Sequence, residues 1–230
     1  MIDKNDIRVV AFDADDTLCD NETHFKQVEH DMCKVLEQYA PAETVSEHLF
    51  ATEMKNMPDY GYGAIAFTLS LMENAIKVTN GKVTGEELLQ ILELGRSLLH
   101  LKATPLPGVT DVLSYLSGKY HLVLFTKGEL LTQEHKLQRS GLKPFFEKTV
   151  IVSDKQETQY RELYHDLGIQ PKQFVMVGNS LKSDIRPALD TGACAIYIPF
   201  DVMWQHEVTD DFEHPHMVRI ENFEEIKRYL

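Results

Sequence analysis

The stretch Val9-Val10-Ala11-Phe12-Asp13-Ala14-Asp15-Asp16-Thr17-Leu18 is the most informative part of this 230-residue chain. Its apolar, β-branched beginning predicts a buried strand, and the strand ends in two carboxylates separated by one residue. Open α/β sheets bind their ligands at the carboxyl ends of strands. Two acids at such a place repel each other and favour a divalent cation, which prefers oxygen ligands. We therefore expect an α/β protein with a site built around Asp13 and Asp15.

The second half of the chain alternates short apolar runs with helical patterns. Further strands are expected at 121–125, 149–152, 173–177 and 194–198. The helices expected beside them cover 109–116, 129–141, 160–168 and 184–192. Such alternation predicts right-handed βαβ units and a Rossmann-like, doubly wound parallel sheet. The tail, 217–230, is expected to add an edge strand and a short helix.

The segment 21–102 has a different pattern, typical of four amphipathic helices. Pro41 and Pro58 are expected to end the first two, and Asn80-Gly81 the third. Thr84 to Glu87 predicts a capping box that begins the fourth. Four helices with short connections predict a small antiparallel bundle. We expect a core domain of residues 1–20 and 103–230 and an inserted four-helix cap domain of residues 21–102.

Composition restricts the partners and the setting of the protein. The formal net charge of −13 disfavours nucleic acid and anionic membrane as partners, whereas a small phosphorylated molecule could still bind beside a cation. Cys19, Cys33 and Cys194 have no zinc or redox spacing, which indicates a reducing, cytoplasmic setting. The N-terminal residues lack the apolar core of a signal peptide, and no apolar run approaches the roughly 20 residues that span a bilayer.

Polar groups also follow the other expected strands. Thr126 and Lys127 end the strand near 125, and a hydroxyl with neighbouring N–H groups at such a junction suits a phosphate. Lys155 follows the strand near 152. Asn179 and Asp184 follow the strand near 177 and offer oxygen ligands.

Each of these groups also has a purely structural explanation. Thr126 would cap the helix that begins near Glu129, and Lys155 would be a solvated surface lysine. Asn179 would belong to a simple turn, and Asp184 would be an acid favoured at a helix N-terminus.

Taken in order, the four strand ends resemble the four motifs of the haloacid dehalogenase superfamily, in its phosphatase branch with a helical cap between the first two motifs. Asp13-x-Asp15-x-Thr17 resembles the first motif, Thr126 the second and Lys155 the third, with Lys127 as a competing lysine. Gly178 to Asp184 resembles the fourth. Two residues depart from the pattern: Asn179 replaces an Asp, and Asp16 stands where Gly is commonest.

The resemblance implies Mg²⁺-dependent hydrolysis of a phosphate monoester of a small metabolite through an aspartyl-phosphate. Asp13 would be the nucleophile and Asp15 the general acid and base. Thr126, Lys127 and Lys155 would bind the substrate phosphate. The magnesium ion would be held by four residues, Asp13, Asp15, Asn179 and Asp184.

Other functions remain open at this point. A phosphomutase of the β-phosphoglucomutase kind would keep all four motifs. A 2-haloacid dehalogenase shares the fold but lacks an acid two residues after the nucleophile, so Asp15 favours phosphoryl chemistry. Asn179 could instead mark a non-catalytic binding module. Tyr60 and Tyr62, in an expected aromatic loop of the cap, either contact the substrate or pack the cap, and the substrate itself does not follow from these residues.

Overall fold

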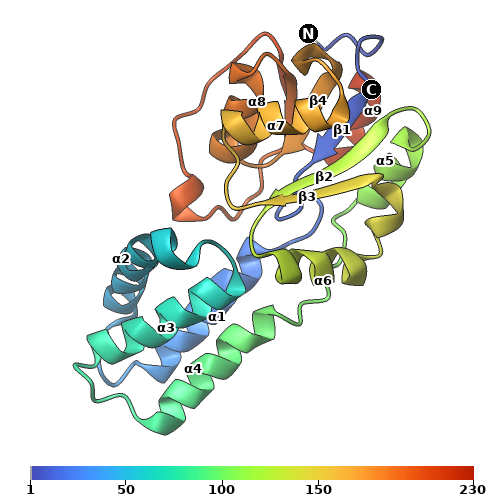
Figure 1. Cartoon of the computed structure of the whole chain (residues 1–230). Coiled ribbons are helices and arrows are strands. Elements are labelled where there is room, and N and C mark those ends of the chain that lie inside the picture. Colours follow the sequence, from blue (N-terminus) through green and yellow to red (C-terminus); the bar gives the residue numbers. More distant parts are fainter. Residues whose placement is uncertain (1) are drawn as a thin grey trace. The chain divides into compact units, whose positions relative to one another are not determined.

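The computed structural model describes residues 2–230 and contains a six-stranded, wholly parallel sheet (Figure 1). The strand order is β3-β2-β1-β4-β5-β6, so β1 lies inside the sheet between β2 and β4. This order confirms the predicted doubly wound architecture. The strands are β1 (Val9–Phe12), β2 (His121–Lys127), β3 (Lys148–Val152), β4 (Phe174–Gly178), β5 (Cys194–Tyr197) and β6 (Met217–Arg219).

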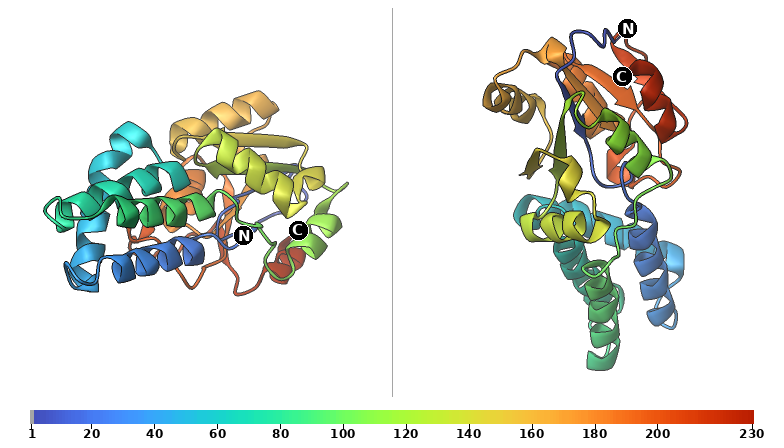
Figure 2. Two further views of the ribbon diagram at one scale, coloured as in Figure 1. Left: turned by 90° about the horizontal axis from the view of Figure 1, so that it is seen from below. Right: turned by 90° about the vertical axis from the view of Figure 1, so that its right-hand side faces the viewer.

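Both faces of the sheet are covered because alternate strand residues point to opposite sides. Val10 and Phe12 of β1 pack in the cluster that contains α5, whereas Val9 and Ala11 pack in the cluster that contains α7. The views in Figure 2 show helices on both sides of the strands. The helices that alternate with these strands or follow them are α5 (Val109–Leu116), α6 (Leu130–Ser140), α7 (Glu157–Leu167), α8 (Arg186–Asp190) and α9 (Ile226–Tyr229).

The strand register brings the predicted site residues to one edge of the sheet. Phe12 pairs with Leu124 of β2 and with Val177 of β4. The residues that come shortly after these three positions therefore lie at the same edge of the sheet. Asp13, Thr126 and Asn179 all belong to this carboxyl edge.

The chain divides into two compact units, which are described separately. One unit comprises Ala103–Leu230 together with the residues up to Glu22, and the other is Thr23–Lys102. The helices α1 (Glu22–Val35), α2 (Ala42–Tyr60), α3 (Ala64–Val78) and α4 (Gly85–Leu98) share an apolar core around Met32, Leu49, Leu71 and Ile91. The inserted segment thus has a core of its own.

The core unit holds both ends of the insertion close together. Leu106 N–H donates to the carbonyl of Leu18 at 2.8 Å, and the Cys19 thiol donates to the carbonyl of Ala103 at 3.2 Å. Asp16 (φ 59°) and Ala103 (φ 53°) adopt left-handed backbone conformations at these two crossings. The chain therefore leaves the core and returns to it through adjoining positions.

Two helix ends match the prediction and two elements differ from it. The Thr84 hydroxyl accepts from the N–H of Glu87, whose carboxylate accepts from the N–H of Thr84 at 2.7 Å, so the capping box is present. The left-handed Asn80 and Gly81 follow α3. The expected break at Pro58 is wrong, because α2 continues through Pro58 to Tyr60. A proline in the last turn removes only one hydrogen bond of the helix.

The second difference lies between β4 and β5. The expected single helix over 184–192 is a π-helical turn, Leu181–Ile185, followed by α8. The side chain of Ser180 caps this turn by accepting from the N–H of Ser183 at 2.9 Å.

Among residues 2–230, no helix combines the length and the apolar character that crossing a membrane requires.

Candidate active site

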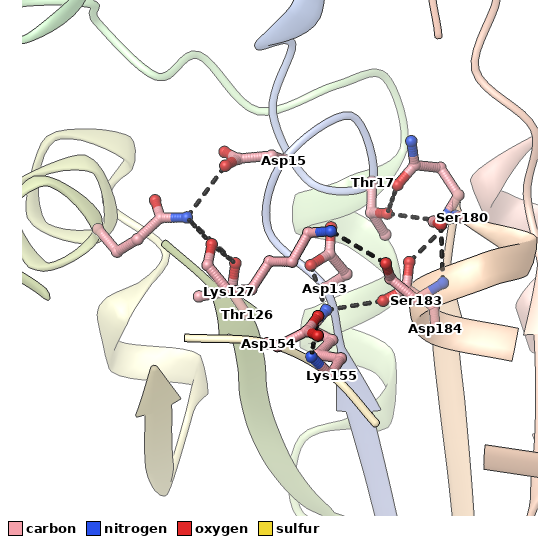
Figure 3. A network of polar contacts seen from close by, with 12 residues as sticks. Asp13, Asp15, Thr17, Thr126, Lys127, Asp154, Lys155, Ser180, Ser183 and Asp184 are labelled. Carbon is pink, nitrogen blue, oxygen red and sulfur yellow. Dashed lines mark hydrogen bonds and ion pairs between the residues drawn. The ribbon is translucent and has the colours of Figure 1, made fainter. Parts of the chain in front are cut away.

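Three buried charged groups meet at the carboxyl edge of the sheet (Figure 3). Asp13 directly follows β1, Lys155 lies beyond β3, and Asp184 lies in the turn after β4. The Lys155 ammonium donates to Asp13 at 2.5 Å and to Asp184 at 2.7 Å. The Lys155 side chain is only 1% exposed, which rules out the surface-lysine explanation.

With both acids ionised, this trio carries one more negative charge than positive charge. Burial raises the pKa of Asp13 to about 7, and the Asp184 and Asp15 carboxylates reinforce the rise while Lys155 opposes it. Burial alone would lower the pKa of Lys155, but its two carboxylate partners raise it, so the ammonium stays charged. The pair Asp13 and Asp184 therefore has capacity for a further cation.

Gly178 explains how Asp184 comes so close to the sheet. A Cβ atom at Gly178 would lie 2.3 Å from Oδ2 and 2.6 Å from Cβ of Asp184, which no rotation of the carboxylate could relieve. The same Oδ2 accepts from the N–H of Ser180 at 3.0 Å. The Tyr160 hydroxyl donates to the Asp184 carbonyl at 2.8 Å. The backbone and the side chain of Asp184 are both fixed.

The Asp15 side chain points away from Asp13 toward α6 (Figure 3). Its Oδ2 accepts from Nε2 of Gln133 at 3.0 Å, and its Oδ1 forms an ion pair with Lys136. Lys136 also donates to the side chain of Asn21 at 2.7 Å. The structure thus directs the Asp15 carboxylate away from Asp13, and two residues of α6 hold it.

Thr126 and Lys127 end β2 but face different partners. Thr126 is buried, and its hydroxyl accepts from Nε2 of Gln133 at 3.2 Å. The Lys127 ammonium donates to the Ser183 hydroxyl at 3.0 Å and forms an ion pair with Glu207. Of the two lysines weighed from the sequence, Lys155 forms an ion pair with Asp13.

Asn179 contacts the first loop rather than the carboxylate trio. Its Oδ1 accepts from the Thr17 hydroxyl at 3.1 Å, and its N–H donates to the same Thr17 oxygen at 3.1 Å. A side-chain carbonyl oxygen has two lone pairs, so one remains for a cation. The loops after β1 and β4 are tied together by these two hydrogen bonds.

Asp16 has a structural task in this loop. One of its carboxylate oxygens accepts from the N–H of Asn21 at 2.8 Å and from the N–H of Glu22 at 2.9 Å, where α1 begins. Burial raises the pKa of Asp16 to about 7, although these hydrogen bonds oppose the rise. A carboxylate that receives two backbone N–H groups explains an acid at a position where Gly is commonest.

Three residues of this region were not found from the sequence: Gln133, Lys136 and Glu207. Gln133 and Lys136 lie one helical turn apart on α6, and this spacing on a helix that follows Thr126 is the only signal that could have indicated them. Glu207 lies far along the chain in an irregular segment. Among residues 2–230, no group of three or more His, Cys, Asp or Glu side chains has the arrangement of a metal site.

The chain resembles known hydrolases over most of its length. Residues 7–192 match the family of haloacid dehalogenase-like hydrolases. Human N-acylneuraminate-9-phosphatase is 26% identical over 199 residues, which cover 81% of this chain and 79% of that protein. Glyceraldehyde 3-phosphate phosphatase of Methanothermobacter thermautotrophicus is 27% identical over 203 residues, covering 84% and 85%.

A solved structure gives the same relationship in three dimensions. The crystal structure of a haloacid dehalogenase-like family hydrolase from Xanthomonas campestris superposes with a TM-score of 0.88 at 31% identity, covering 97% of this chain and 91% of that one. The family match extends over well more than half of the 230 residues. The chain therefore belongs to the haloacid dehalogenase-like hydrolase family, as an enzyme of its phosphatase group.

Proposed function

We propose that this enzyme hydrolyses phosphate monoesters of small metabolites with Mg²⁺ and through an aspartyl-phosphate on Asp13. The observation that carries the proposal is the pairing of the Lys155 ammonium with both Asp13 and Asp184 at the carboxyl edge of the sheet. The pairing keeps the Asp13 carboxylate buried beside a fixed positive charge. An attacking carboxylate and a charge for the phosphoryl oxygens are thus side by side.

The proposed reaction has two displacements at phosphorus. A carboxylate oxygen of Asp13 forms a bond to phosphorus while the bond to the leaving oxygen breaks, and Asp15 gives its proton to that oxygen. A water molecule then attacks the aspartyl-phosphate, transfers a proton to Asp15 and releases inorganic phosphate and the Asp13 carboxylate. Gln133 and Lys136 of α6 hold Asp15 for both proton transfers.

Phosphate binding is assigned to three groups. Lys155 supplies a buried charge beside Asp13, and the hydroxyl of Thr126 lies at the end of the neighbouring strand. Lys127 adds a second ammonium beside the Ser183 hydroxyl. These charges offset the repulsion between a phosphate dianion and the acids of the site.

The residues fit a magnesium ion by the chemistry of their donors. Asp13 and Asp184 offer two buried carboxylates, and a single ammonium leaves them with a net negative charge. Magnesium favours such oxygen ligands. The proposed ligands are Asp13, the backbone carbonyl of Asp15, Asn179 and Asp184. When bound, the ion would offset the charge of the phosphate next to Asp13.

The inserted helices are proposed as the cap domain that selects the leaving alcohol. Tyr60, the last residue of α2, is 53% exposed, and Gly61 (φ 69°) and Gly63 (φ 110°) follow it. Such an exposed ring suits contact with a substrate better than packing. The names of the two curated phosphatases above suggest phosphorylated sugars as the first substrates to test. The buried free thiols of Cys19, Cys33 and Cys194 support a reducing, cytoplasmic setting.

The test is release of inorganic phosphate from p-nitrophenyl phosphate and a panel of sugar phosphates, with Mg²⁺ and with EDTA. We expect phosphate release only with the metal. Conversion of a sugar phosphate to an isomer without release of phosphate would identify a phosphomutase instead. Full activity in EDTA would contradict the magnesium assignment, and no hydrolysis of any ester would contradict the proposed function.

A further inference from the structure

A second cluster of charged and polar side chains lies beside the carboxylate trio. Its centre is Glu207, in the 3₁₀ turn Gln205–Glu207 of the connection between β5 and β6. The Glu207 carboxylate forms an ion pair with Lys127 and accepts from the hydroxyls of Ser180 and Ser183, the latter at 2.8 Å. One carboxylate thus contacts residues from two other segments, the end of β2 and the turn after β4.

The Lys127–Glu207 pair differs from an ordinary surface ion pair. The two side chains are 17% and 12% exposed, whereas those of the pair between Arg219 of β6 and Asp211 of the same connection are 44% and 64% exposed. Burial by itself would raise the pKa of Glu207, yet the Lys127 charge and the hydrogen bonds lower it to about 2. Glu207 is therefore a charged carboxylate next to the site, held by one ammonium and two hydroxyls.

Each partner of Glu207 is a sequence neighbour of a proposed site residue. Lys127 follows Thr126, Ser180 follows Asn179, and Ser183 precedes Asp184. Ser180 also donates its N–H to Asp184 at 3.0 Å, and its hydroxyl accepts from the N–H of Ser183 at 2.9 Å. The position of Glu207 is thereby coupled to the phosphate side and to the cation side of the site.

We propose that Glu207 is a positioning residue for the reaction: it holds the Lys127 ammonium at Ser183 and thereby fixes the turn that carries Asp184. The proposal rests on the proposed function. If the charge of Glu207 is lost, the Lys127 ammonium is drawn toward the other carboxylates of the site, such as that of Asp184, the sequence neighbour of its partner Ser183. A displaced ammonium there would compete with a cation for the carboxylate oxygens and would no longer stand where it binds the substrate phosphate.

The test is a double-mutant cycle with E207Q, K127M and the combination of the two. For E207Q we expect kcat with p-nitrophenyl phosphate to fall about 10- to 100-fold, while KM changes less than about threefold. The dissociation constant for Mg²⁺, measured by calorimetry without substrate, should rise about tenfold or more. In the K127M background, E207Q should change both values less than about twofold, since the ammonium it releases is gone.

A control variant and a conservative variant complete the design. D211N removes the exposed ion pair with Arg219 from the same connection and touches none of the proposed site residues, so its kcat and Mg²⁺ affinity should equal those of the wild type. E207D keeps the charge with a shorter reach and should show a smaller loss than E207Q. Should E207Q not fold, as judged by thermal unfolding, E207D takes its place in the cycle: its shorter side chain weakens the ion pair with Lys127, so its loss should again be smaller in the K127M background.

Two results would overturn the proposal. One is E207Q behaving like D211N. The other is that E207Q lowers kcat and Mg²⁺ affinity equally with and without Lys127, which would indicate that Glu207 supports the turn without acting through the ammonium. If the wild type hydrolyses no ester, the proposed function fails, but the Mg²⁺ titrations of the wild type and the variants still test the role of Glu207.

Discussion

Lys155 contributes one positive charge to a buried cluster that also contains two carboxylates. The Asp13 and Asp184 side chains are 10% and 2% exposed, so solvent screens neither of them well. Removing either acid relieves repulsion as well as breaking an ion pair. A mutation of either acid can therefore abolish turnover without lowering the stability of the folded protein.

Replacing Asp13 by Asn tests the nucleophile directly. The amide keeps the shape but replaces the anionic carboxylate with a neutral, poorly nucleophilic group, so we expect kcat to fall more than about a thousandfold. Because the repulsion with Asp184 is also removed, the temperature of unfolding should not decrease. Steady-state phosphate release and thermal unfolding by circular dichroism measure the two effects. A D13N protein that keeps a tenth of wild-type turnover would contradict the assignment.

Replacing Gln133 by Leu tests the control of Asp15. Loss of the hydrogen bond at Oδ2 should misplace the acid, and the loss matters most when the leaving oxygen needs a proton. We expect kcat/KM to fall about tenfold for an alkyl phosphate and clearly less for p-nitrophenyl phosphate, whose leaving group needs little protonation. Gln138→Leu, at an exposed position of the same helix, is the matched control. Equal losses for both esters would refute the role of Gln133.

The predicted site residues that the structure brings together lie at the carboxyl ends of strands or within a few residues beyond them. Asp13, Thr126, Lys155 and Asp184 stand where the apolar pattern ends, so sheet topology alone predicts their convergence. Gln133 and Glu207 could not be found in this way. Their roles depend on how a helix and a long irregular connection fold back onto the sheet edge, and no local pattern encodes that.

At the scale of elements, α3 and α4 approach each other closely at Gly95. A Cβ atom there would lie 2.2 Å from Oγ1 and 2.8 Å from Cβ of Thr68. The Thr68 hydroxyl is itself held by the Ala64 carbonyl at 2.6 Å. Gly95 is thus a packing requirement in the middle of a helix, although alanine has the better helix propensity.

Gly95→Ala and Gly85→Ala form a matched pair within α4. The first should lower the free energy of unfolding of the helical unit by about 1–3 kcal/mol, since the overlap with Thr68 outweighs the gain in propensity. The second faces open space at the start of the helix and should be neutral or stabilising by up to about 1 kcal/mol. Urea unfolding measures both. A stabilised G95A protein would show that the two helices can separate without cost.

The limits of prediction at this scale lie where local rules compete. The capping box was predictable because its two partners, Thr84 and Glu87, are only three residues apart in the sequence. The continuation of α2 through Pro58 was not, because a proline near a helix end costs only one hydrogen bond and the wider packing decides whether the turn persists.

At the scale of the whole molecule, Glu207 makes stability depend on pH. Its folded-state pKa of about 2 lies below the ordinary value of 4.5, so the unfolded chain binds the proton more readily. The resulting stabilisation is complete above pH 4.5 and is lost as the pH falls toward 2, with a ceiling of roughly 3 kcal/mol. The unfolding temperature of the wild type should exceed that of E207Q at pH 6, and the gap should close by pH 2. A gap that is constant with pH would contradict the shifted pKa.

The adjoining positions of the two crossings have a further consequence. Because Leu18 and Cys19 bind the returning chain at Leu106 and Ala103, a different helical segment could be grafted at this junction without moving any strand. On the proposed role of the inserted helices, recombination at this one junction would exchange the specificity of the enzyme while the strands and the residues at their ends are inherited intact.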